Sequence, residues 1–118
     1  MSLITRPQRQ QLLANGRAGR EARRGGLAFD PFPVVQLVAQ DEWPRWLLSE
    51  IDPQNPDRAF GICDLGDAPA QLGFVSLRGI EVLKSVLGID VRQPKGFIAD
   101  RSVSEYLECL RVHGRIIP

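Results

Sequence analysis

The chain has 118 residues, of which 43% are hydrophobic and 25% are charged, and its formal net charge is +1. This length suits one domain with a single hydrophobic core, and the composition is ordinary for a globular protein, which argues against a disordered or fibrous class. The apolar runs are far shorter than the ~18 residues of a transmembrane helix, and the N-terminus lacks the apolar stretch of a signal peptide, so we expect a cytoplasmic protein.

Positive charge is concentrated at the N-terminus. Residues 1–24 carry six arginines against one glutamate, a net charge of +5, whereas the remainder carries nine Lys or Arg against thirteen Asp or Glu, a net charge of −4. A basic segment attached to an acidic body is a recognised indication of binding to nucleic acid or to an acidic partner surface.

The N-terminal segment predicts a short helix. Thr5 is a suitable N-cap, Pro7 fits the first turn, and Gly16 would end the helix at about residues 5–15. Residues 17–26 contain three glycines and four arginines, which is typical of a flexible basic linker. We therefore expect a short helix and a linker over residues 1–26, and a single α+β domain over residues 27–118.

Four strands are expected next. Their apolar and β-branched residues lie at 34–38, 46–51, 58–65 and 72–75, and residues 52–57 form a turn cluster. No helix separates these strands, which favours an antiparallel meander over a parallel sheet.

The C-terminal part predicts two helices around one more strand. Ser76 is the expected N-cap of a helix from Leu77 to about Leu87, and residues 89–98 are the expected fifth strand, interrupted at Pro94. The pattern of Ser102 and Glu105 matches a capping box, and Gly114 would end that helix. We expect a five-stranded, mainly antiparallel sheet with the two C-terminal helices on one face.

Several local strings resemble a known family, and they cover about two thirds of the chain. The strings are DPFPVV at 30–35, WLLSE at 46–50 followed by Asp52, AFGICDLG at 59–66, LGFVSL at 72–77 and LGI at 87–89. They resemble the domain of unknown function (DUF) family 2958, small uncharacterised proteins common on bacterial plasmids and integrative elements. The resemblance implies a cytoplasmic accessory protein of mobile genetic elements, without established catalytic residues.

The histidine and the cysteines give little support to catalysis. His113 is the one histidine and lies on a terminal turn, where a Ser/His or Cys/His pair would be unusual. Cys63 and Cys109 match no zinc-ligand spacing and are expected to be free thiols. We therefore expect no catalytic residue, no metal and no cofactor.

Carboxylates leave one enzymatic alternative open. If the second and third strands pair, Glu50 and Asp64 could approach one another and, with Asp52, form a divalent-metal site of a hydrolase. The same residues are also ordinary in turns and at strand ends, where aspartate makes local hydrogen bonds.

Two surface features favour binding instead. The linker arginines Arg17, Arg20, Arg23 and Arg24 could follow a phosphate backbone by charge, or they could simply keep the chain soluble. Trp43 and Arg45 have the composition of an interface. We expect a non-enzymatic binding or accessory protein with an unknown protein partner, or nucleic acid bound weakly and without sequence preference through the basic arm.

Overall fold

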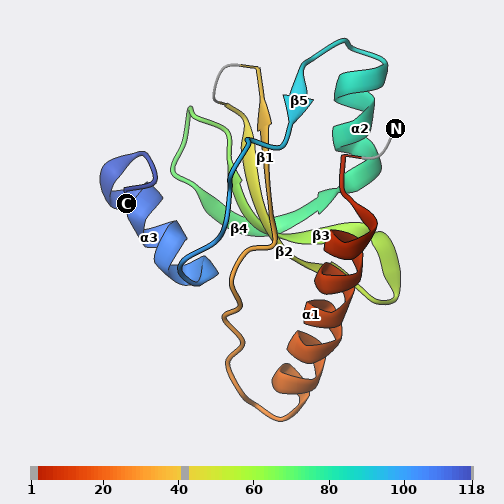
Figure 1. Cartoon of the computed structure of the whole chain (residues 1–118). Helices are drawn as coiled ribbons and strands as arrows, with labels where there is room; N and C mark the ends of the chain where they lie inside the picture. The colour runs from red at the N-terminus through yellow and green to blue at the C-terminus, as the bar shows by residue number, and fades with distance from the viewer. Residues whose placement is uncertain (1–2, 41–42, 118) are drawn as a thin grey trace.

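The computed structural model describes residues 3–40 and 43–117, and in this part of the chain five strands form one antiparallel sheet, β4-β3-β2-β1-β5, with three helices around it (Figure 1). The expected α+β class and antiparallel sheet are confirmed. The strands are β1 (Val35–Ala39), β2 (Arg45–Asp52), β3 (Asn55–Asp64), β4 (Gln71–Ser76) and β5 (Val91–Arg92). The helices are α1 (Arg6–Arg24), α2 (Leu77–Ser85) and α3 (Val103–His113).

Helices cover both faces of the sheet, because β2 is apolar on both sides. Leu48 points into a core that includes Leu12 of α1 and Ile80 of α2. Its neighbour Leu47 points into a second core that includes Tyr106 of α3, since successive strand residues face opposite ways. The two C-terminal helices therefore lie on opposite faces, α2 beside α1 and α3 alone, and not on one face as the sequence led us to expect (Figure 1).

Helix α1 continues to Arg24, through the residues that we expected to be a linker. Arg23 and Arg24 lie in its last turn, where positive charge interacts favourably with the helix dipole. Leu12 is fully buried in the core that α1 shares with α2 and the sheet, so α1 is part of the same domain as the strands.

The glycines of α1 are contact residues and not helix breakers. The pairing of β1 with β2 ends where Val35 faces Leu48, and α1 packs against the next stretch of β2. A Cβ atom at Gly16 would lie 1.9 Å from the carbonyl oxygen of Ile51, and one at Gly19 would lie 2.7 Å from Oε1 of Glu50. Glycine at these positions allows the helix backbone to approach the strand, which is why two glycines are buried inside a helix.

Two strand boundaries also differ from expectation. The turn between β2 and β3 consists of Pro53 and Gln54, and β3 already begins at Asn55, because an irregular register accommodates Pro56. The strand expected at residues 89–98 is reduced to β5, which pairs with the end of β1.

The expected helix N-caps are confirmed. Thr5 accepts a hydrogen bond from the Gln8 backbone N–H, Ser76 accepts from Gly79, and Ser102 forms the reciprocal capping box with Glu105. Both cysteines are free. None of the helices within the described ranges is long and apolar enough for a membrane crossing.

We expect Gly16→Ala to lower the free energy of unfolding. Alanine in a helix is favoured over glycine by about 1 kcal/mol, but the added Cβ forces α1 away from Ile51, and overpacking of this kind costs about 1 to 3 kcal/mol or more. Urea unfolding measures the difference. Gly79→Ala in α2 is the matched control, since its nearest new contact would be 3.4 Å away, and it should leave stability unchanged or raise it. A Gly16→Ala variant as stable as the wild type would contradict the close contact.

Candidate functional site

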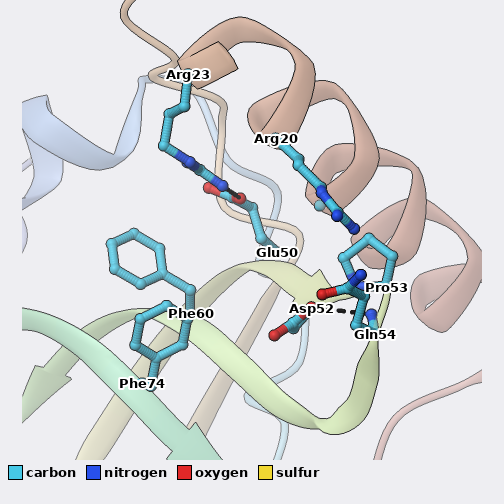
Figure 2. Close-up of a pocket in the computed structure, with 9 residues that line it drawn as sticks. Arg20, Arg23, Glu50, Asp52, Pro53, Gln54, Phe60 and Phe74 are labelled. Carbon is cyan, nitrogen blue, oxygen red and sulfur yellow. Dashed lines mark hydrogen bonds and ion pairs between the residues drawn. The ribbon is translucent and has the colours of Figure 1, made fainter.

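A cavity of about 450 Å³ lies between the C-terminal half of α1 and the sheet (Figure 2). Helix α1 contributes Gly16, Arg20 and Arg23 to its lining, and β2 contributes Glu50 and Asp52. The hairpin turn after β2 and two phenyl groups complete the walls. The cavity thus joins two residues of the expected basic arm to two of the carboxylates singled out from the sequence.

Glu50 reaches this cavity because β2 is irregular. The register with β3 shifts so that Leu48 faces Gly61 while Glu50 faces Phe60, which leaves Ser49 as an extra residue. In a regular strand Glu50 would point into the same core as Leu48. The bulge turns it to the face of Phe60 and returns Ile51 to the core that holds Leu48. Residues of α1 still reach Glu50 there, because the second half of α1 lies beside the edge of β2 where the pairing with β1 has ended.

The Glu50 carboxylate is almost completely enclosed, with 6% of its side chain exposed. Burial raises the pKa of Glu50 above its ordinary value, and Arg23 acts in the opposite direction. Nη2 of Arg23 lies 3.3 Å from Oε1 of Glu50, and the Arg23 side chain is 59% exposed. Arg23 therefore partly compensates a buried negative charge while its own guanidinium stays open to solvent.

Arg20 lies one turn before Arg23 on α1 and is held by the hairpin turn. With its side-chain oxygen directed toward α1, Gln54 accepts hydrogen bonds from both terminal nitrogens of Arg20 at 3.0 Å. The backbone N–H of Gln54 donates to Oδ1 of Asp52 at 2.9 Å, which fixes the turn (Figure 2). Because its partner is a neutral amide, the positive charge of Arg20 is not cancelled by this contact.

The remaining wall is aromatic. Phe60 of β3 and Phe74 of β4 are cross-strand partners whose ring centroids are 5.1 Å apart at an interplanar angle of 59°, a favourable tilted arrangement (Figure 2). Phe74 is 54% exposed. Outside the cavity, the guanidinium of Arg58 lies over the Phe74 ring, 3.7 Å from its centroid.

These groups divide the cavity into three chemical zones. The phenyl wall suits a flat or apolar body, the guanidinium groups of Arg20 and Arg23 suit an anion, and the buried carboxylate of Glu50 suits N–H donors. Pockets of this size with a few convergent polar groups are typical of sites for small organic ligands.

The third carboxylate of the hydrolase alternative lies elsewhere. Asp64 faces Arg45 near one end of the β2–β3 pair, whereas Glu50 faces Phe60, and four residues of β3 span about 13 Å. This corrects the expectation that strand pairing brings Glu50 and Asp64 together. Across the described residues, no three His, Cys, Asp or Glu side chains gather into a group that could hold a metal ion.

Asp64 instead belongs to a buried ion pair. Nε of Arg45 donates to Oδ2 of Asp64 at 2.9 Å, and their side chains are 7% and 9% exposed. Nε1 of Trp43 donates to the same oxygen at 3.2 Å, and the backbone N–H of Gly66 donates to Oδ1 at 3.1 Å. Another Arg45 nitrogen, Nη2, donates to the carbonyl oxygen of Gly114 after α3. Of the two interface candidates, Arg45 is thus buried in a structural ion pair, whereas Trp43 is 39% exposed.

The four arginines of the expected arm have separate positions. Arg20 and Arg23 line the cavity, whereas Arg17 and Arg24 are exposed on α1. Nη1 of Arg24 lies 3.7 Å from Oε1 of Glu21, one turn away on the same helix. The helix therefore fixes the spacing of these charges, which a flexible arm would leave free.

Sequence reasoning did not single out five of the residues that line this site, among them Gln54, Phe60 and Phe74. Both phenylalanines were visible at the ends of the expected β3–β4 hairpin, but their pairing depends on the register, in which Cys63 faces Gln71. Counting back from that pair places Phe60 opposite Phe74, so a known loop length would have revealed the aromatic wall.

The chain belongs to the family described as a protein of unknown function (DUF2958), whose model matches residues 3–117. This confirms the resemblance drawn from the local strings and extends it over α1 and α3. No curated protein and no solved structure matches the chain.

We expect Asp64→Ala to destabilise the protein strongly, because it leaves the buried guanidinium of Arg45 without a counter-charge. Removing one member of a buried ion pair costs about 3 to 5 kcal/mol. Asp67→Ala, an exposed aspartate in the loop after β3, removes the same charge and should change stability little. Urea unfolding compares the two, and equal stabilities would contradict a structural role for Asp64.

Proposed function

We propose that the protein is a non-enzymatic binding protein whose ligand is a small organic molecule held in the cavity between α1 and the β2–β4 part of the sheet. The observation that carries the proposal is the meeting of two guanidinium groups, one buried carboxylate and two phenyl rings around about 450 Å³ of space. Ligand sites in proteins have this size and this combination of an apolar wall with a few polar groups.

The polar groups are arranged for recognition. Arg23 is positioned by Glu50, Arg20 by Gln54, and the turn that carries Gln54 by Asp52. Side chains that are already held in place lose little conformational entropy when a ligand arrives, which favours affinity. The association with bacterial mobile genetic elements that the family resemblance implies remains part of this proposal.

Binding of nucleic acid through a basic arm was the alternative expected from the sequence, and its mode of binding needs restating. The four arginines lie on a helix that packs against β2, so they do not form a flexible arm that could follow a phosphate backbone. A nucleic acid that uses Arg20 and Arg23 would place one of its phosphates or bases at the cavity.

We expect the purified protein to retain a small molecule when it is incubated with a bacterial extract filtered to remove macromolecules and is then separated by gel filtration. Mass spectrometry of the released compounds, quantified per protein chain, is the measurement. Phe74→Ala should lose the compound because it removes half of the aromatic wall.

Leu72→Ala is the matched control, since Leu72 lies two residues earlier on the same face of β4, is 45% exposed and does not line the cavity. Wild type and Leu72→Ala should retain the same compound in similar amounts. The proposal is overturned if nothing is retained, or if all three proteins retain the same compounds equally.

A further inference from the structure

We infer that the ligand of this cavity is a nucleotide, with its base on the Phe60–Phe74 wall, its phosphate at Arg20 and Arg23, and N–H groups of the base donating to Glu50. The inference rests on the proposed function and names the chemical class of the ligand. It applies equally to a free nucleotide and to one nucleotide of a single strand, because both present the same base and phosphate.

The phosphate end is indicated by the two guanidinium groups. Each carries five N–H donors, of which Arg23 gives one to Glu50 and Arg20 directs two terminal nitrogens at Gln54. The remaining donors suit a phosphate group, whose oxygens can accept from both guanidinium groups, and arginine is the residue that binds phosphate in this forked manner.

The base end is indicated by the wall and by the carboxylate beside it. Aromatic side chains bind nucleobases by stacking, whatever the base. Glu50 is the cross-strand neighbour of Phe60, so an aromatic ring on this wall has its edge near the carboxylate. A carboxylate accepts from the amino and imino groups of a base, as glutamate does from the amino group of cytosine.

The Glu50 carboxylate also restricts which aromatic rings can bind against the phenyl wall. Glu50 is buried, with Arg23 as its ion-pair partner, and an unsubstituted aromatic ring pressed against it would cover a charge without giving it a hydrogen bond. A ring with N–H donors avoids that cost. This requirement, together with the two guanidinium groups, favours a nucleotide over an aromatic amino acid.

Arg58, which does not line the cavity, extends the stacking surface, since its guanidinium lies over the Phe74 ring. Guanidinium planes stack on unpaired bases as phenyl rings do. In a single strand, a neighbouring base would have a stacking position at Arg58, whereas a free mononucleotide would not use it.

Isothermal titration calorimetry with defined probes tests the inference. The probes are AMP, CMP, GMP and UMP, then adenosine and ribose 5-phosphate as halves of a nucleotide, and an eight-residue single-stranded DNA. At least one mononucleotide should bind more tightly than either half. Binding of ribose 5-phosphate as strong as that of every nucleotide would reduce the site to a phosphate site and overturn the inference.

Variants assign each end of the ligand. Arg20→Ala should weaken nucleotide binding about tenfold, the typical effect of losing a charged hydrogen bond, and leave adenosine binding unchanged. Phe74→Ala should weaken both nucleotide and adenosine binding at least about fivefold, as the loss of a stacking ring does. Arg17→Ala, an exposed arginine on the same helix outside the cavity, is the control and should have no effect. Circular dichroism of each variant confirms that it is folded.

One further result distinguishes a free nucleotide from a single strand as the ligand. Another distinguishes failure of the nucleotide inference from failure of the proposed binding function. If a single strand is the ligand, Arg58→Ala should weaken binding of the oligonucleotide but not of the mononucleotide. If a free nucleotide is the ligand, Arg58→Ala should weaken binding of neither probe. Retention of a compound without a base in the extract experiment, with no binding of any nucleotide, overturns this inference and leaves the binding function standing. Failure of both experiments overturns both.

Discussion

The close contact between α1 and β2 is the constraint on which the rest of the site depends. Gly16 brings the helix backbone so near to the strand that even a methyl group would meet the carbonyl oxygen of Ile51. Asn15 adds a hydrogen bond from its side-chain nitrogen to the carbonyl oxygen of Ser49 at 3.0 Å. Arg20, one helical turn further along, and Arg23, two turns along, are consequently held near the sheet, and the space between them and the phenyl groups becomes the cavity.

The bulge in β2 supplies the second half of the arrangement. It directs Glu50 out of the apolar core and toward Arg23, so a buried carboxylate obtains an ion-pair partner from α1. A buried charge without a partner would be costly, and the pair therefore links the position of the helix to the shape of the strand. The part of β2 that carries the bulge is also the part that α1 contacts, so the bulge and the close position of the helix depend on each other.

The sequence predicted the parts of the fold that depend on local chemistry. The caps at Thr5, Ser76 and Ser102, the antiparallel strands and the two free cysteines follow from residue type and spacing within a few positions. The end of α1 was mispredicted because glycine can either end a helix or allow a helix to pack closely against another element. Gly16 and Gly19 are helix breakers by propensity, and only contact with a distant strand makes them necessary inside a helix.

The site was predicted in part, and for a similar reason. Arg20, Arg23, Glu50 and Asp52 were all singled out from the sequence, but as members of two unrelated features, a basic arm and a carboxylate cluster. Their meeting depends on a helix that crosses to β2 and on a one-residue bulge, and neither has a local signal. Asp64 and Arg45 were likewise noted separately, for metal binding and for an interface, while the strand register makes them partners of one another.

Native-state hydrogen exchange over α1 is the most direct test of this account. Because the helix is docked on β2 through its second half, the backbone amides of residues 16–22 should be protected from exchange to nearly the same degree as those around Leu12 in the core. If residues 17–24 exchange at the rate of an unstructured chain while the first half of α1 is protected, the helix ends at Gly16, the arginines belong to a linker, and the cavity does not exist.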